Sequence, residues 1–178
     1  QWFLPDAREN RWAAKYVYGV EHSFDLGTAT KVNMILHGDG SSNIFVQDGL
    51  LPFSSYSKEE SLNKLSQSKK EKSYYNKELN EQFDVIITNP PFNVDLDKDT
   101  KKEVTKEFIF GDKKNSENLF IERWYQLLKP NGRFGAILPE SFFDVSDNKY
   151  IRIYLYKYFK IKSVISLPQL TFQPFTST

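Results

Sequence analysis

The stretch Phe83-Asp84-Val85-Ile86-Ile87-Thr88-Asn89-Pro90-Pro91-Phe92 decides the fold, because an apolar strand runs directly into a rigid polar turn. Side chains alternate between the two faces of a strand, so consecutive apolar residues from Val85 to Ile87 predict burial on both faces. Such burial is typical of a central strand in a sheet covered by helices. The prolines cannot continue the strand, because they lack the N–H that a strand ladder needs.

The same alternation of apolar runs and amphipathic segments extends over the rest of the chain. The patterns predict strands at residues 15–20, 43–47, 83–88, 133–138 and 162–167, and helices at 23–36, 118–128 and 150–159. Two polar stretches, 53–82 and 94–115, read as insertions, the first partly helical and the second a mobile loop. Strands that alternate with helices predict an α/β fold with a mostly parallel open sheet, in one domain of residues 1–178.

Composition excludes several classes of protein. The chain has 178 residues and is 39% hydrophobic, enough for one sizeable core. Its formal net charge is only +1, so any contact with nucleic acid has to be local. It has no cysteine, which excludes disulfides and thiol nucleophiles. We expect no metal site, because His22 and His37 lack partners at ligand spacing. The absence of an apolar span and of a signal sequence predicts a cytoplasmic protein with no membrane partner.

Polar residues follow each predicted strand at its carboxyl end. Glu21 follows the first strand, Asp48 the second, Asn89 the third and Pro139-Glu140 the fourth. In open parallel sheets, ligands bind at this edge. The sequence therefore predicts one binding site built from these residues.

The Asn89-Pro90-Pro91-Phe92 turn offers hydrogen-bond acceptors with few neighbouring donors. The Asn89 amide oxygen and the main-chain carbonyls of a stiff proline corner would suit a nitrogen with two hydrogens. An exocyclic amino group of a nucleobase and a glutamine amide both have that form. Phe92 supplies a flat face for stacking, worth about 1–3 kcal/mol per base. By itself, however, Asn-Pro-Pro is also an ordinary way to close a strand.

Further blocks of sequence accompany this turn in a fixed order. They are Tyr18-Gly19-Val20-Glu21, residues 33–38, Asn43-Ile44 with Asp48-Gly49-Leu50, residues 83–92, residues 127–133, Ile137-Leu138-Pro139-Glu140 and residues 165–168. Together they resemble the amino-group DNA methyltransferases, above all the methylation subunits of type I restriction-modification systems and their fused relatives. The resemblance implies a Rossmann-like fold, S-adenosylmethionine as cofactor and methylation of the N6 amino group of adenine in DNA.

The resemblance also implies a role for each residue of the site. Glu21 would accept hydrogen bonds from the ribose of S-adenosylmethionine, and Asp48 would accept one from its adenine, with Gly49 allowing close approach. Asn89 and Pro90 would hold the target amino group, and Asn89 would also border the cofactor. Pro91 would stiffen the turn, and Phe92 would stack on a base flipped out of the duplex. Partners would be DNA and the specificity and restriction subunits or domains of such a system.

The chain departs from that family's pattern at both ends. The glycine-rich loop that follows the family's first strand has no match before Tyr16, and the sequence stops where a final antiparallel strand is expected. We therefore expect an incomplete sheet without its first and last strands, in a piece of a larger enzyme that is inactive alone. Exposed sheet edges would allow dimers. Methylation of RNA or of a protein glutamine, and a non-catalytic scaffold of the same fold, are the alternative interpretations.

Overall fold

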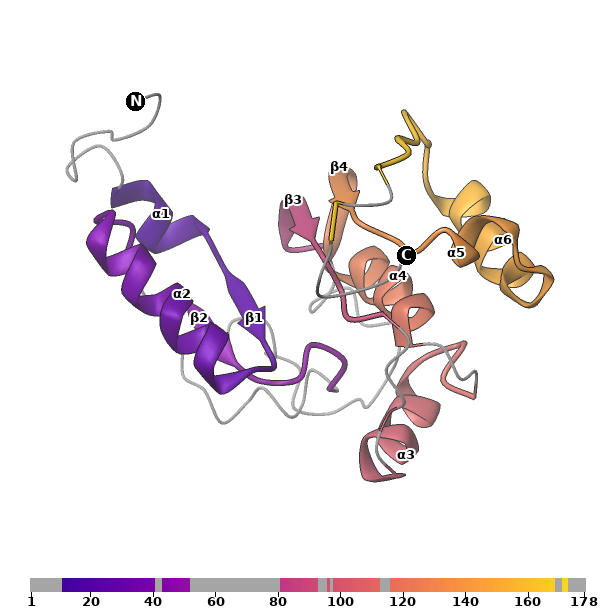
Figure 1. Ribbon diagram of the computed structural model, residues 1–178, viewed down its shortest axis with the longest axis horizontal. Helices are drawn as coiled ribbons and strands as arrows, with labels where there is room; N and C mark the ends of the chain where they lie inside the picture. The colour runs from indigo at the N-terminus through magenta and orange to yellow at the C-terminus, as the bar shows by residue number, and fades with distance from the viewer. Residues whose placement is uncertain are drawn as a thin grey trace. The chain divides into compact units, whose positions relative to one another are not determined.

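The computed structural model describes residues 11–40, 43–51, 81–92, 96, 98–112, 116–168 and 171–172. These residues form two compact units, one within Gln1–Ser66 and the other within Gln67–Thr178. We refer to them as the N-terminal unit and the C-terminal unit. Figure 1 shows the elements of each, with the N-terminal unit in indigo to purple and the C-terminal unit in magenta to yellow.

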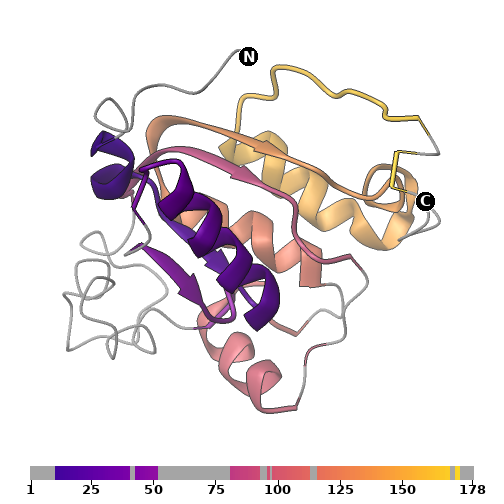
Figure 2. The ribbon, with the colours of Figure 1, turned by 60° about the vertical axis from the view of Figure 1, so that its left-hand side comes forward.

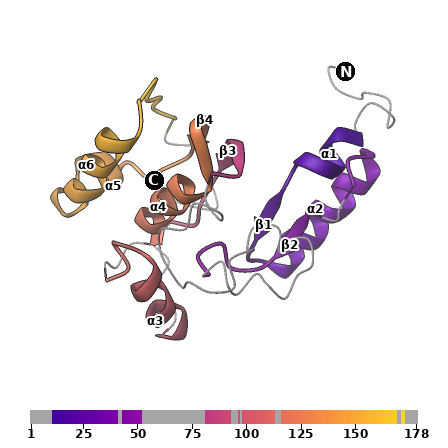
Figure 3. The same ribbon diagram turned by 180° about the vertical axis from the view of Figure 1, so that it is seen from behind.

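The N-terminal unit is a strand–helix–strand motif preceded by a short helix. Its elements are α1 (Arg11–Tyr16), β1 (Gly19–Glu21), α2 (Phe24–Leu36) and β2 (Ile44–Val46). The two strands are parallel neighbours, with Gly19 opposite Ile44 and Glu21 opposite Val46. Helix α2 runs alongside the pair as the crossover between them, as the view from behind shows (Figure 3).

Helix α2 begins and packs where its sequence favours it. Ser23 is the N-cap, and its side-chain oxygen accepts a hydrogen bond from the Leu26 nitrogen at 3.4 Å. Gly27 is buried, and a Cβ there would lie only 2.6 Å from Cγ2 of Val46. The absence of a side chain at Gly27 therefore lets the helix approach β2 closely. The predicted helix at 23–36 is confirmed, although Phe24 and Leu36 on it are largely exposed.

The C-terminal unit has a second parallel pair of strands and more helices. Its elements are β3 (Phe83–Thr88), α3 (Lys98–Glu107), α4 (Ser116–Leu127), β4 (Leu128–Ala136), α5 (Ser141–Asp144), the 3₁₀ turn η3 (Ser146–Asn148) and α6 (Lys149–Tyr158). Strand β4 pairs in parallel with β3, so that Ile86 lies opposite Phe134. The register jumps between Phe83 and Val85, beside a turn of β4 in which Asn131 has φ +66°. Figure 2 shows the two strands side by side, with α4 and α6 against them.

The core of the C-terminal unit lies between the sheet and its helices. Among the described residues, its main cluster is formed by Ile121, Trp124, Phe142, Ile151, Tyr154 and Leu155. Ile86 and Phe134 pack against it from the sheet, with the rings of Trp124 and Phe134 at 5.5 Å between centroids. On the other face of β3, Val85 is 58% exposed and Ile87 is 87% exposed. The prediction that β3 is buried on both faces is therefore wrong in this structure.

Three predicted elements differ from the structure. The segment at 15–20 is not one strand, because α1 extends to Tyr16 and packs through the buried Ala13, leaving a strand only at Gly19–Glu21. The segment 94–115 is not simply a loop, because it contains α3, which is anchored by the fully buried Val104. Residues 162–167 form no strand, since no described strand offers them a backbone partner.

The other predicted elements are confirmed with small changes of boundary. The predicted strand at 43–47 appears as β2 and that at 83–88 as β3, while the predicted helices at 118–128 and 150–159 appear as α4 and α6. The strand predicted at 133–138 is β4, which begins earlier. Residues 53–80 of the first insertion lie outside the described residues. The α/β class and the parallel pairing are thus confirmed, while the described strands form two separate pairs.

Candidate functional site

Glu21 and Asp48 lie at the ends of the two strands of the N-terminal unit, at the same edge. Strand β1 ends at Glu21, and the main-chain oxygen of Glu21 accepts a hydrogen bond from the Gln47 nitrogen at 3.0 Å. This bond holds the chain that leaves β2 beside the end of β1, and Asp48 follows immediately. Because the strands are parallel, both carboxylates lie at the carboxyl edge, as the sequence predicted.

Each of the two carboxylates is oriented by its own turn. One side-chain oxygen of Glu21 accepts a hydrogen bond from the Ser23 nitrogen at 2.7 Å, which joins it to the start of α2. One side-chain oxygen of Asp48 accepts from the Leu50 nitrogen at 2.9 Å, which is an Asx turn through Gly49. All three residues Glu21, Asp48 and Gly49 are partly exposed. Asp48 therefore stabilises its turn, and part of its carboxylate still faces solvent.

The predicted catalytic turn lies at the carboxyl end of β3 in the C-terminal unit. Asn89 and Pro91 are exposed, Phe92 is partly exposed and Pro90 is buried. Burial of Pro90 fixes the corner, because the ring already restricts the backbone there. The amide of Asn89 and the ring of Phe92 keep surface available for a planar group.

The segment that follows β4 lies next to this turn. The Ile137 nitrogen donates a hydrogen bond to the main-chain oxygen of Thr88 at 3.1 Å, one residue before Asn89. Pro139 and Glu140, which the sequence placed at the same edge, follow two residues later. Pro139 is partly exposed and Glu140 is exposed. The carboxyl edge of the β3–β4 pair therefore brings together the two segments that were predicted to meet there.

Polar side chains, of which Asn118 and Asn148 are buried, fix the segment after β4 through contacts that the sequence analysis did not predict. Nη1 of Arg152 donates to the main-chain oxygens of Phe142 and Val145, each at 2.8 Å. The Asn148 amide nitrogen donates to the Ser141 oxygen at 3.2 Å. Asn118 on α4 donates to Asn148 at 2.9 Å and to the Tyr150 hydroxyl at 2.8 Å. Four elements, α4, α5, η3 and α6, are thereby joined through side chains.

Burial and these contacts give several side chains of the helices a structural role. Asn118 and Leu119 are fully buried in α4, and Phe120 packs against the core. Arg152 is engaged with main-chain oxygens. The sequence showed only that amide side chains stand among apolar residues of the helices. That pattern does not reveal which residues the amides bind.

Glu122 is a second buried polar residue that the sequence analysis missed. Its carboxylate is fully buried and accepts hydrogen bonds from the nitrogens of Ile109 at 2.8 Å and Phe110 at 3.2 Å. Burial raises the pKa of Glu122 from 4.5 to about 7, and the two backbone hydrogen bonds and Arg123 oppose that rise. The position of an acid on the apolar face of α4 was the available signal. Its contacts give it the role of holding the turn after α3.

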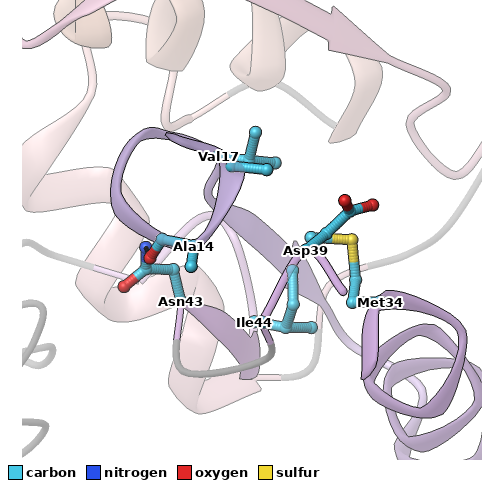
Figure 4. A pocket seen from close by; sticks show the side chains of 8 residues that line it. Ala14, Val17, Met34, Asp39, Asn43 and Ile44 are labelled. Atoms are coloured by element: carbon cyan, nitrogen blue, oxygen red, sulfur yellow. Dashed lines mark hydrogen bonds between the residues drawn. The ribbon is translucent and has the colours of Figure 1, made fainter. Parts of the chain in front are cut away.

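A shallow depression in the N-terminal unit contains none of the predicted site residues. Figure 4 shows that its lining comes from α1, the end of α2 and the beginning of β2, including Val17, Met34 and Asp39. The Asn43 amide nitrogen donates to the Ala14 oxygen at 2.9 Å beside it. It lies where β2 begins, whereas Glu21 and Asp48 lie at the ends of the strands. The depression is too shallow to enclose a water molecule, so we assign it to packing.

The described residues contain neither a cluster of metal ligands nor a membrane-spanning helix. Among them, no three histidine, cysteine or acidic side chains gather as a metal would require. His22 and His37 are both exposed. None of the helices in the described ranges is long and apolar enough to cross a membrane.

Comparison with known proteins identifies a shared family. The profile described as "Eco57I restriction-modification methylase" matches residues 15–172. The methylase subunit of the type I restriction enzyme EcoEI of Escherichia coli is 24% identical over 177 residues, which is 98% of this chain and 31% of that protein. The type II restriction enzyme and methyltransferase RM.Eco57I of Escherichia coli is 36% identical over 88 residues, 43% of this chain and 8% of that protein.

A third relative supports the same grouping. The type II methyltransferase M.VspI of Vibrio sp. (strain 343) is 27% identical over 75 residues, 42% of this chain and 18% of that protein. The resemblance to restriction-modification methyltransferases inferred from the sequence motifs is confirmed by these matches. The chain spans between 8% and 31% of the length of these three relatives.

Proposed function

Since this chain belongs to the Eco57I restriction-modification methylase family, we propose that it carries out methyl transfer from S-adenosylmethionine to the N6 amino group of adenine in DNA. The observation that carries this proposal is the turn at the end of β3, in which an exposed Asn89 precedes a buried Pro90 and an exposed Pro91. This turn presents acceptors at the edge of a parallel sheet where ligands bind.

The turn is suited to hold an amino group for alkylation. The Asn89 side-chain oxygen and the Pro90 main-chain oxygen are acceptors, and Pro91 brings no N–H that would occupy them. Two hydrogen bonds donated by one amino nitrogen to these oxygens would draw its lone pair out of conjugation with the purine. The nitrogen would then form a bond to the methyl carbon as the carbon–sulfur bond of the cofactor breaks, S-adenosylhomocysteine would leave, and the nitrogen would lose a proton to solvent. Positioning supplies most of the rate in such a reaction.

The carboxylates of the N-terminal unit fit a nucleoside cofactor. Ionised carboxylates are acceptors only, which matches ribose hydroxyls and an adenine amino group. Glu21 and Asp48 are partly exposed at one sheet edge and are each oriented by a backbone N–H. We assign the ribose to Glu21 and the adenine to Asp48, with Gly49 leaving room beside it. When bound, S-adenosylmethionine supplies the electrophilic methyl group.

Phe92 follows the corner and is partly exposed. An adenine has to leave the duplex before its amino group can be reached, and this loses stacking with its neighbours. A flat aromatic face at Phe92 would restore part of that stacking, worth about 1–3 kcal/mol per base. We therefore assign Phe92 to the target base.

The names of the relatives support a setting for this reaction. They describe a methylase subunit of a type I restriction enzyme and a combined type II restriction enzyme and methyltransferase. We propose that the protein works in a restriction-modification system, together with specificity and restriction subunits or domains. Selection of the DNA sequence would then fall to those partners.

Substitution of Asn89 tests the proposal. In the intact protein, Asn89→Ala removes the side-chain acceptor, and we expect at least a hundredfold loss of labelled-methyl transfer to unmethylated duplex DNA. Binding of S-adenosylmethionine, measured by calorimetry, is expected to stay within a fewfold of wild type. DNA, RNA and protein substrates are assayed in parallel, with the product identified as N6-methyladenine. Unchanged activity, or transfer to RNA or protein alone, would overturn the proposal.

A further inference from the structure

The net positive charge of this chain lies at one end of the sequence, because that end has no acidic residue. Residues 149–178 contain Lys149, Arg152, Lys157, Lys160 and Lys162 and no acidic residue. The formal charge of this segment is therefore +5, while the whole chain has +1 and residues 1–148 have −4. A weakly charged protein thus contains a strongly basic segment.

Helix α6 presents two of these lysines, Lys149 and Lys157, on one side. Ile151, Tyr154 and Leu155 are buried against the core, whereas Lys149, Tyr156 and Lys157 are exposed. At about 100° per residue, positions 149, 153, 156 and 157 lie on the side opposite the buried residues. Lys160 and Lys162 follow the end of the helix and are also exposed. We call Lys149, Tyr156, Lys157, Lys160 and Lys162 the α6 basic stripe.

Within the described ranges, acidic side chains do not neutralise the lysines of the α6 basic stripe. No ion pair joins any of them to an acidic side chain among the residues that the structure describes. The acids closest in sequence are Asp144 and Asp147, which precede the helix. Lys157 Nζ lies 5.0 Å from the centre of the Tyr158 ring, an interaction that keeps its charge. Arg152 differs from the lysines, because it is bound to main-chain oxygens.

Exposed side chains of a second kind lie among these lysines. Tyr156 is 76% exposed and Ile153 is 56% exposed. Tyrosine hydroxyls, like lysines, donate hydrogen bonds to phosphate oxygens. A rise of about 1.5 Å per residue separates Lys149 and Lys157 by about 12 Å along the axis, and one DNA strand has a phosphate about every 3.4 Å of its axis. The stripe is thus long enough to contact several phosphates.

We propose that the α6 basic stripe is a binding surface for the phosphodiester backbone of duplex DNA, separate from the Asn89 turn. The partner follows from charge complementarity, because the stripe contains donors and positive charge and no carboxylate. Contacts of this kind hold and orient DNA without reading its sequence. The choice of DNA as the polyanion that binds the stripe rests on the proposed function. The proposal adds a surface that would hold duplex beside the flipped base.

Salt dependence of binding provides the test. The intact protein is titrated against a labelled duplex in the absence of cofactor at several salt concentrations. Each lost phosphate contact lowers the slope of log K against log salt by about 0.9. For the triple variant Lys157→Gln, Lys160→Gln and Lys162→Gln, we expect a slope smaller by about 3 and roughly tenfold or greater loss of affinity at low salt. The corresponding triple Lys→Arg variant should retain the wild-type slope.

A matched control separates local contacts from total charge. Among the described side chains of helix α3, Lys98, Lys101 and Lys102 are exposed. They are interspersed with acids such as Asp99, which pairs with Lys102 at 3.4 Å. Changing these three to Gln removes the same charge, and we expect the slope to change by less than 1. Equal losses in both triple variants would overturn the proposal, as would tighter binding to anionic lipid vesicles than to DNA.

The outcomes distinguish this proposal from the proposed function. If the wild-type protein methylates DNA and the α6 variant keeps its salt slope, the stripe is not a DNA surface and the proposed function stands. If the wild type binds DNA through the stripe but transfers no methyl group to it, the stripe stands and the proposed function fails. The Asn89→Ala variant should keep the wild-type slope in either case.

Discussion

The main-chain oxygen of Thr88 accepts a hydrogen bond from the main-chain nitrogen of Ile137 at 3.1 Å. This bond extends the pairing of β3 and β4 beyond the last residues of the ladder, Thr88 and Ala136. It therefore holds the start of the Asn89 turn against the segment that leads to Pro139 and Glu140. The geometry of the candidate catalytic turn depends on how firmly that neighbouring segment is held.

Substitution of Asn118, which lies on α4, should loosen the segment after β4. Asn118 is fully buried, and its amide donates to Asn148 and to the Tyr150 hydroxyl. We expect Asn118→Ala to lower the free energy of unfolding by about 1–3 kcal/mol, because two buried hydrogen bonds are lost. Hydrogen exchange should also become faster in residues 139–148. The control is Asn43→Ala, which removes a bond to Ala14 at a more exposed position. Equal destabilisation by both changes would contradict this view.

Substitution of Gly27 tests the close packing of helix α2 that positions Glu21. Replacing a helical glycine by alanine ordinarily stabilises a helix by about 1 kcal/mol. Here the new Cβ would lie 2.6 Å from Cγ2 of Val46, so we expect Gly27→Ala to destabilise the protein by about 1–3 kcal/mol in thermal or urea unfolding. Gly135→Ala is the control, since its Cβ would have no neighbour within 4 Å. Val46→Ala should restore part of the loss. Stabilisation by Gly27→Ala would show that the helix does not pack so closely.

We expect substitution of Glu21 to weaken cofactor binding and to leave the stability of the fold unchanged. Glu21→Gln keeps an oxygen that can accept from the Ser23 nitrogen and removes the negative charge. We expect affinity for S-adenosylmethionine to fall roughly tenfold or more, because charge-assisted hydrogen bonds are about twice as strong as neutral ones. Calorimetry on the intact protein measures this. A loss of unfolding free energy equal to that of Gly27→Ala would instead indicate a structural role.

The raised pKa of Glu122 predicts that the stability of the protein depends on pH. This pKa is about 7 in the folded protein and 4.5 as the reference value for an unperturbed side chain, so between these values the folded state binds more protons. Stability contributed by this group is therefore fully present below about pH 4.5 and is lost as pH rises through about 7. The largest possible loss of unfolding free energy is about 1.4 kcal/mol for each unit by which the pKa is raised.

Glu122→Gln has a neutral side chain throughout that range. We expect the free energy of unfolding, followed in urea from pH 4.5 to 8, to decline less steeply in Glu122→Gln than in the wild type. Glu140→Gln at an exposed position should leave the slope unchanged. Parallel curves for wild type and Glu122→Gln would show that the buried carboxyl does not titrate in this range.

The sequence by itself determined the parallel α/β class, because strand and helix periods differ and the switches between them at Glu21, Asp48 and Asn89 are marked by polar residues. It also determined the family, since the ordered motifs around Asn89-Pro90-Pro91-Phe92 are local. Tertiary structure decided what depends on contacts between distant residues. Residues 162–167 have a strand-like sequence but no strand partner, and α3 exists because Val104 is buried. The amides and acids of α4 gain their roles from partners that lie up to 32 positions away in sequence, which periodicity cannot reveal.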